Sequence, residues 1–378
     1  VAVLDSGIDY THSDLAPNLW YNPGEVPGNG VDDDGNGFVD DHRGWDFDNG
    51  DNDPMDDNGH GTHVAGIIGA VGNNGMGVTG VSQQVQIMNL KFIGSNNVGS
   101  IQGAIDAIDY AVAMGADVVS NSWIVSAPWG APGWDQPGFA PELKDAIERA
   151  NTAGVLFVAA SGNFRVNTDV SPRHPASYDN DNIISVTATD HNDVLYSNAN
   201  FGVTTIDLGA PGIGIYSTVP TGACTYCDPS SYNYIDGSSM STAYVSGTAA
   251  LLKAEDPWLD HLQIKSRILQ SGDSLGSLQG KTLTGKRLNA FTALEDDVPP
   301  SAVTDLGISD VGSSFVVTFT AVGDDGLVGT AAAYDLRYST TVIDSTNFEG
   351  ATTVPTSNPQ SSGAAEVFEI GGLSPSVI

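Results

Sequence analysis

Short apolar runs alternate with segments of helical periodicity through most of this chain. The apolar runs occupy residues 1–4, 85–92, 117–123, 155–160 and 183–189. Apolar residues recur at helical spacing in 101–112, 141–150, 262–269 and 288–294. This alternation, with crossovers long enough to hold a helix, predicts a doubly wound, mostly parallel α/β sheet with helices on both faces.

The pattern changes after residue 296. Asp297-Val298-Pro299-Pro300 is typical of a linker. Beyond it, strand-like runs without helical period occupy 302–308, 315–320, 334–338 and 365–370. We therefore expect an α/β domain at 1–296, a linker at 297–300, and an all-β sandwich module at 301–378. The module is incomplete, because only about four strands are visible where a sandwich needs about seven.

The chain is strongly acidic, with 13 Lys and Arg against 46 Asp and Glu and a formal net charge of −33. This charge argues against nucleic acid and anionic lipid as partners, because both are bound by basic surfaces. The sequence has no run of about 20 apolar residues, so we expect no membrane span. It begins on an apolar run without Met, so we expect a fragment whose signal peptide and propeptide, or another N-terminal segment, are missing.

Asp gathers with Gly and Asn in the loop at 22–59. Residues 32–37 match the first half of an EF-hand loop, but Arg43 stands where that loop needs Glu, so this is no EF-hand. Oxygen ligands on short loops indicate calcium, and a solvated acidic turn is the alternative. The predicted calcium ligands are Asp32, Asp34, Asn36 and Asp40 (or Asp41), with a second group at Asp46, Asn49, Asp51 and Asp53.

The two cysteines, Cys224 and Cys227, form a C-x-x-C pair. No second cysteine pair is present for zinc, and no thioredoxin-like pattern surrounds this one. A small structural disulfide is the favoured interpretation, and two free thiols are the alternative.

Three side chains lie at turns beside predicted strand or helix ends. Asp5 follows the first apolar run, His60 opens a helical segment three residues before His63, and Ser239 lies in a small-residue turn before an Ala-rich helix. Each has an ordinary structural explanation: a turn former, a helix-capping histidine, and a tight packing turn. The order Asp, His, Ser is also one of those in which a catalytic triad occurs.

Four motifs in this order make the chain similar to the subtilisin-like serine proteases over residues 1–296. They are Val3-Leu4-Asp5-Ser6-Gly7-Ile8, His60-Gly61-Thr62-His63-Val64-Ala65-Gly66, Ala160-Ser161-Gly162-Asn163 and Gly237-Ser238-Ser239-Met240. The resemblance implies Ser239 as nucleophile, His60 as general base and Asp5 as the carboxylate that orients it. It also implies that Asn163 donates to the oxyanion.

The resemblance implies substrate-binding and calcium-binding residues as well. The substrate would lie along Ser122, Trp123, Ile124, Ala160, Ser161 and Gly162, with Ile124 where most relatives have Gly. The main calcium site of the family maps onto Asp14, Asn74 and the carbonyls of Val71, Met76 and Val78. Asp46, Asn49, Asp51 and Asp53 resemble a second calcium site of some members.

Residues 301–378 resemble a fibronectin type III module, through 302–306, 334–338 and 372–375. Together these features predict a secreted or cell-surface serine endopeptidase that acts on protein or peptide substrates. It would hold one to three structural Ca²⁺ and no organic cofactor. The alternatives are a catalytically inactive subtilase fold that serves as a binding or surface protein, and a calcium-binding adhesin.

Overall fold

The computed structural model describes residues 1–125, 139–295, 302–312, 314–323, 331, 333–344 and 347–371. The chain divides into two compact units, Val1–Leu294 and Glu295–Ile378. The expected linker at 297–300 and the motif at 372–375 lie outside the described residues, and the expected domain boundary stays a prediction.

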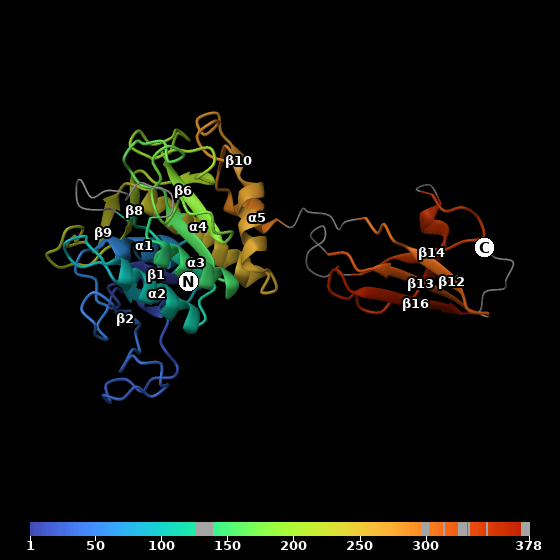
Figure 1. Ribbon diagram of the computed structural model, residues 1–378, viewed down its shortest axis with the longest axis horizontal. Helices are drawn as coiled ribbons and strands as arrows, with labels where there is room; N and C mark the ends of the chain where they lie inside the picture. The colour runs from blue at the N-terminus through green and yellow to red at the C-terminus, as the bar shows by residue number, and fades with distance from the viewer. Residues whose placement is uncertain are drawn as a thin grey trace. The chain divides into compact units, whose positions relative to one another are not determined.

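In the described residues of the first unit, nine strands form one sheet in the order β10-β11-β7-β6-β5-β4-β1-β3-β2. Figure 1 labels β1, β2, β6 and β10 of this sheet. Its strands are β1 Ala2–Asp5, β2 Trp45–Asp46, β3 Met88–Lys91, β4 Val118–Asn121, β5 Leu156–Ala160, β6 Ile183–Thr189, β7 Leu208–Pro211, β10 Asp273–Ser274 and β11 Lys286–Arg287. All neighbouring pairs are parallel except β10 with β11. The predicted mostly parallel sheet is therefore confirmed. The sequence missed β2, β7, β10, β11 and the separate hairpin of β8 Ile215–Thr218 with β9 Tyr232–Ile235.

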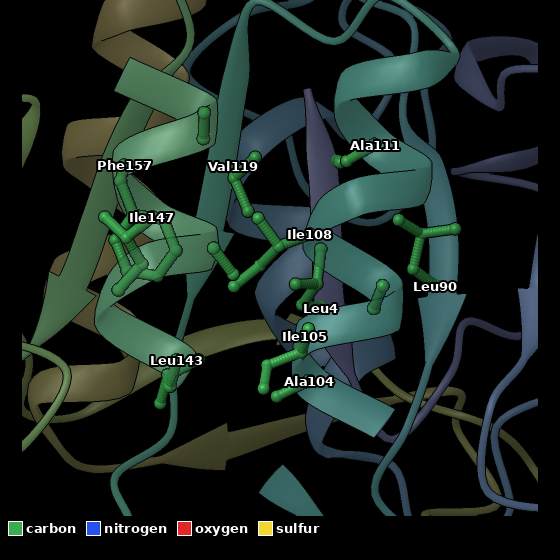
Figure 2. Packing of buried hydrophobic residues seen from close by; sticks show 14 of the residues in the cluster. Leu4, Leu90, Ala104, Ile105, Ile108, Ala111, Val119, Leu143, Ile147 and Phe157 are labelled. Carbon is green, nitrogen blue, oxygen red and sulfur yellow. The ribbon is translucent and has the colours of Figure 1, made fainter. Parts of the chain in front are cut away.

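Helices cover both faces of this sheet. They are α1 His60–Gly69, α2 Ile101–Ala113, α3 Pro141–Thr152, α4 Ser238–Glu255, α5 His261–Ser271 and α6 Ala290–Leu294, with a 3-10 turn η1 at Ala16–Asn18. In Figure 2, Ile105 and Ile108 of α2 and Ile147 of α3 point toward Leu4, Val119 and Phe157 of the sheet. The alternate strand residues, including Val118, Leu156 and Val158, pack on the α4 side. Strand side chains alternate between the two faces, so a strand buried on both sides must be continuously apolar.

The ends of these helices follow their local sequence. The Ser100 hydroxyl caps α2 by accepting from the Gly103 N–H, as its position predicts. Pro141 opens α3, and Gly115 and Gly154 have φ of 75° and 82° just beyond α2 and α3. Asp260 and Gln263 form a capping box at α5. Each described helix is too short or too polar to cross a lipid bilayer.

The described part of the second unit contains strands and one 3-10 turn. β12 Gly307–Asp310, β13 Ser314–Thr320 and β16 Ala365–Gly371 form one antiparallel sheet, and β14 Leu336–Tyr338 pairs with β15 Thr352–Val354. The 3-10 turn η2 spans Phe348–Gly350. Val317, Phe319 and Phe368 form a small buried cluster. The sequence did not predict β15, because three residues are too few for an alternating pattern.

Candidate active site

Asp5 is the last residue of β1, at the carboxyl end of a central strand. Its side chain is only 1% exposed, and the Ser6 N–H donates to its Oδ1 at 2.7 Å. The first residue of α1, His60, lies beside it, with 2.8 Å between His60 Nδ1 and Asp5 Oδ1. A Cβ on Gly61 would lie 2.2 Å from the Gly7 carbonyl oxygen, so only glycine lets α1 approach the end of β1 this closely.

The surroundings of His60 act on its charge in opposite directions. Burial lowers the pKa of His60, while the charge and hydrogen bond of Asp5 and the charge of Asp56 raise it, and the net pKa lies above the ordinary value. Its neighbour His63 is fully buried, with Nε2 at 3.0 Å from the Ile215 carbonyl oxygen. Burial, and then the nearby His60, lower the pKa of His63 to about 4. His60 is therefore the histidine that binds a proton more readily, and His63 stays neutral near pH 7.

Ser239 is the second residue of α4, which is the longest helix of the described chain. Its Oγ donates to the Ser122 carbonyl at 3.0 Å, and Ser122 Oγ donates to the Ser239 carbonyl at 2.9 Å. Since Ser122 directly follows β4, this pair ties the α4 N-terminus to the sheet edge that carries Asp5. Among the described residues, no hydrogen bond joins Ser239 to His60. Hydrogen bonds between catalytic groups are often long before a substrate binds, so the lack of this bond does not argue against a shared function.

Asn163 lies beside the turn that leads into α4. Its Oδ1 accepts from the Ser238 N–H at 3.0 Å, and within the described chain its Nδ2 has no acceptor. A Cβ on Gly237 would lie 2.9 Å from that Nδ2, and Gly237 has φ of 148°, so the turn requires glycine. The N–H of Ser239 lies in the first turn of α4, where helix N–H groups have no acceptor within the helix. Asn163 Nδ2 and the Ser239 N–H are thus two donors at the start of α4.

A cleft of about 570 Å³ opens next to Asp5 and His60. Three of the six predicted substrate-binding residues, Ser122, Trp123 and Ile124, line it. The other walls are mostly apolar and come from Phe92, Ile93, Val98, Ile101, Val125, Phe139, Leu143 and Tyr226.

The other three predicted substrate-binding residues form a separate group. Ala160, Ser161 and Gly162 lie at and just beyond the end of β5, and all three are buried. The Gly162 N–H donates to Ser238 Oγ at 3.0 Å, so this segment contacts the turn before α4.

The wall beside His60 includes a residue that the sequence analysis missed. Tyr226 lies between Cys224 and Cys227, which are bonded to each other. Its N–H donates to the Asn58 carbonyl at 2.9 Å, and its ring centroid is 6.0 Å from that of His60. The predicted disulfide thus closes the loop that presents Tyr226, and only the C-x-x-C spacing pointed to this loop.

Of the predicted calcium ligands in the loop at 22–59, the structure gathers some and separates others. Oxygens of Asp32, Asp34 and Glu25 lie within 4.8 Å of one another. Asp40 is turned elsewhere, where its two oxygens accept from the N–H groups of Asn29 and Gly30. Asn36 accepts from the Phe38 N–H, and its Nδ2 faces Asp34 and Asp41.

Glu25 was not predicted as a ligand, because it lies outside the Asp-rich motif. It is 6% exposed, and its Oε1 accepts from the N–H groups of Asp33 and Asp34. Its buried Oε2 has no hydrogen-bond partner among the residues that the structure describes. A buried carboxylate oxygen without a donor fits a cation, so Glu25, Asp32 and Asp34 suit calcium better than the predicted set does.

The predicted main calcium site centres on Asp14, which is fully buried. Asp14 Oδ1 accepts from Asn74 Nδ2 at 2.5 Å, and Oδ2 accepts from the Val78 N–H and the Tyr232 hydroxyl. The structure thus brings Asp14, Asn74 and Val78 together. The Val71 N–H donates to the Asp14 backbone carbonyl. Met76 lies on the same loop, where its N–H donates to Asn74 Oδ1.

The predicted second group does not gather its carboxylates. Asp46 is buried and accepts from the N–H groups of Asp48 and Asn49. The Asp51 carboxylate accepts from the Asp53 N–H, and the Asp53 carboxylate accepts from the Tyr10 hydroxyl. Within the described residues, no cluster of three carboxylates or histidines includes these three Asp residues. Most of these hydrogen bonds close local turns, which is the alternative use of such a loop.

Known proteins match the first unit of the chain. A family model described as the subtilase family matches residues 1–293. Subtilisin-like protease 1 of Plasmodium vivax is 32% identical over 312 residues, covering 78% of this chain and 46% of that protein. A thermophilic serine proteinase of Bacillus sp. (strain AK1) is 34% identical, covering 78% and 61%. Thermitase of Thermoactinomyces vulgaris is 32% identical, covering 78% and 88%.

A crystal structure of a cold adapted subtilisin-like serine proteinase has a TM-score of 0.55 and 26% identity with this chain. The match covers 75% of this chain and 86% of that one. The chain spans about half the length of the first two relatives, since it covers 46% and 61% of them.

Proposed function

This chain belongs to the subtilase family, and we propose that it is a serine endopeptidase that hydrolyses peptide bonds through an acyl-enzyme. The observation that carries the proposal is the 2.8 Å contact of His60 Nδ1 with the buried Asp5 carboxylate, at the sheet edge where the α4 N-terminus holds Ser239. A carboxylate on one ring nitrogen keeps the other nitrogen available as a base.

In the proposed reaction, Ser239 Oγ attacks the carbonyl carbon of the peptide while His60 Nε2 takes the hydroxyl proton. Asp5 holds the ring in the required tautomer and stabilises the imidazolium. His60 then gives the proton to the leaving amine, the C–N bond breaks, and a water molecule hydrolyses the acyl-enzyme by the same route in reverse. For this step, Ser239 Oγ must exchange its hydrogen bond with the Ser122 carbonyl for one with His60.

The oxygen of the tetrahedral intermediate becomes an anion and needs donors that are already in position. We assign Asn163 Nδ2 and the Ser239 N–H to this role. The support is that the Asn163 amide is oriented by its bond from the Ser238 N–H, which leaves its donor group uncommitted within the described chain.

The substrate chain would lie along Ser122, Trp123 and Ile124, with Ala160, Ser161 and Gly162 opposite. The cleft beside His60 would take an apolar side chain, because most of its walls are apolar. Ile124 puts a branched side chain where most relatives have Gly, and it narrows this subsite.

Calcium would act as a structural ligand. Glu25, Asp32 and Asp34 would hold one ion, and Asp14 with Asn74 and carbonyls of Val71, Met76 and Val78 would hold another. A third, at Asp46, Asn49, Asp51 and Asp53, has less support because its carboxylates face their own turns. Calcium binding stabilises the folded state by mass action.

We also propose that the protein is secreted or displayed at the cell surface, where calcium and disulfides are stable. Residues 301–378 would form a fibronectin type III-like module that binds another molecule or acts as a spacer. The antiparallel sheet of β12, β13 and β16 agrees with such a module.

Labelling with a fluorophosphonate probe tests the proposal, because such probes modify only an activated serine. Modification should occur at Ser239, identified by mass spectrometry of the labelled peptide, and Ser239→Ala should abolish both labelling and peptide hydrolysis while the protein stays folded. A folded protein that neither reacts nor hydrolyses peptides would instead be an inactive, binding form of the fold. The bond of Ser239 Oγ to the Ser122 carbonyl is the observation that favours this second function.

A further inference from the structure

A second buried carboxylate, Asp56, lies under the start of α1, four residues before His60. It is 5% exposed. Its Oδ1 accepts from Ser6 Oγ at 2.9 Å, the Asn58 N–H at 3.0 Å and the Gly59 N–H at 2.8 Å. Its Oδ2 accepts from the Thr62 N–H at 3.0 Å and the Thr62 hydroxyl at 2.6 Å. The mechanism described above does not use this carboxylate.

These five donors connect Asp56 to both sides of the Asp5–His60 contact. Gly59 directly precedes His60, and Thr62 follows it on α1. Ser6 directly follows Asp5, the last residue of β1. Ser6 Oγ also accepts from the Gly61 N–H at 2.9 Å, so β1 and α1 are joined through Asp56 and Ser6. The relative position of Asp5 and His60 therefore depends on this network.

Asp56 also replaces the missing cap of α1. The residue at the N-cap position, Gly59, has no side chain to satisfy the first helix N–H groups. A carboxylate at a helix N-terminus is stabilised by these N–H groups and by the helix dipole, and both favour its charged form. The pKa of Asp56 lies above its ordinary value, because burial outweighs the hydrogen bonds from Gly59, Thr62 and Asn58 that lower it. Its charge nevertheless raises the pKa of His60, so the carboxylate acts on the ring as an anion.

The backbone is shaped to let Asp56 come this close. Gly7 has φ of 99°, and a Cβ there would lie 2.5 Å from the Pro54 carbonyl oxygen and 3.0 Å from the Asp56 nitrogen. Only glycine at position 7 allows the segment 54–56 to lie against the end of β1.

We infer that Asp56 is a positioning residue that holds His60 against Asp5 and adds a second negative charge beneath the imidazolium. This inference rests on the proposed protease function. Asp56 does not touch the reacting atoms, so it acts only through the position of His60 and through its charge.

The charged and titratable groups around His60 come from every neighbouring segment. They are Asp5 on β1, Asp56 and Asp57 before α1, His63 on α1, Lys91 on β3 and Tyr226 in the disulfide loop. Lys91 is paired with Asp57 at 2.7 Å, and His63 is neutral, so among the described residues Asp5 and Asp56 are the charges that act on the ring. Removal of the Asp56 charge should therefore make His60 easier to deprotonate.

The test uses Asp56→Asn and Asp56→Ser in the full natural chain, because both variants lose the charge and the Ser side chain leaves room for water. The acid limb of the kcat/KM–pH profile should move to lower pH by about half to one unit, while kcat at the optimum falls. Ser6→Ala keeps the charge but breaks the connection between β1 and α1, so it should lower kcat with an unmoved acid limb. Asp57→Asn is the matched control, and its shift should be less than half of that of Asp56→Asn.

A direct readout is the NMR titration of the His60 ring in a Ser239→Ala background, with and without Asp56→Asn, since it needs no activity. An unchanged His60 pKa, an acid limb that stays in place, or failure of both neutral variants to fold would overturn the inference. If the parent protein neither hydrolyses peptides nor reacts with fluorophosphonate, the proposed protease function fails. The inference fails separately, when the parent is active and the two Asp56 variants titrate like it.

Discussion

Replacement of Asn163 should separate transition-state stabilisation from folding stability. Asn163→Asp keeps an acceptor for the Ser238 N–H but removes the donor, and Asn163→Leu removes both groups at similar volume. In either variant kcat should fall by about 10²- to 10³-fold, which corresponds to about 2.7–4 kcal/mol for one lost oxyanion donor. KM should change little, because this donor interacts with the oxygen only when it becomes negative.

The effect on stability should be much smaller. The structure shows one hydrogen bond to the Asn163 side chain, from the Ser238 N–H at 3.0 Å. A neutral bond of this kind contributes about 1 kcal/mol. Asn163 is exposed, so in Asn163→Leu a water molecule replaces the lost acceptor of the Ser238 N–H. For a unit of this size, we expect the melting temperature to fall by no more than about 2 °C.

The assay is steady-state hydrolysis of a chromogenic peptide p-nitroanilide, with active enzyme counted by fluorophosphonate titration. Asn198→Leu is the matched control: Asn198 is also an exposed Asn, and its side chain donates only to the Tyr196 hydroxyl within the described chain. It should keep the parent kcat. The reasoning would be refuted if both Asn163 variants kept kcat within about 5-fold of the parent, or if they lost activity only because they had unfolded.

Three further predictions concern protons and metal. Activity should fall on acidification with a midpoint above about pH 6.5, and a pH–rate profile measures this midpoint. The reason is that Asp5 raises the pKa of His60, and only the neutral ring accepts a proton. The same raised pKa stabilises the fold below pH 6.5, and that contribution is lost as pH rises through the folded-state pKa of His60. Burial lowers the pKa of His63 to about 4. The free energy of unfolding should therefore fall by roughly 2 kcal/mol as the pH is lowered from 6.5 to 4, because the unfolded chain binds this proton more readily. Urea unfolding measures this fall, which should be smaller in His63→Gln. EDTA should lower the melting temperature of the parent by more than that of Glu25→Gln, and equal decreases would contradict a calcium site at Glu25.

The sequence predicted most of the central sheet, because buried parallel strands are continuous apolar runs and the helices between them keep a 3.6-residue period. The strands it missed are short or lack that pattern, such as β7 Leu208–Pro211 and the two-residue β10 and β11. Their place depends on pairing with distant strands. A local pattern does not record such pairing.

The candidate site divides in the same way. Asp5, His60, Asn163 and Ser239 were predicted because each lies in a local motif whose residue types the chemistry requires. Their contacts with Ser6, Ser122 and Ser238 come from the structure alone.

What the sequence alone determined is the alternation of apolar strands and helices in the centre of the sheet and the short motifs at their ends, since both depend on residues close together in the chain. Only the tertiary structure brought Glu25 to Asp32, Tyr226 to His60 and Asp56 to Ser6. Glu25 and Asp32 lie in one loop, Ser6 and Asp56 are 50 residues apart, and Tyr226 and His60 lie on connections that are distant in the chain. The physical reason is that a loop closes at nearly the same entropic cost over a wide range of lengths. Chain distance therefore does not say which loops touch, and packing of the α/β layers decides it.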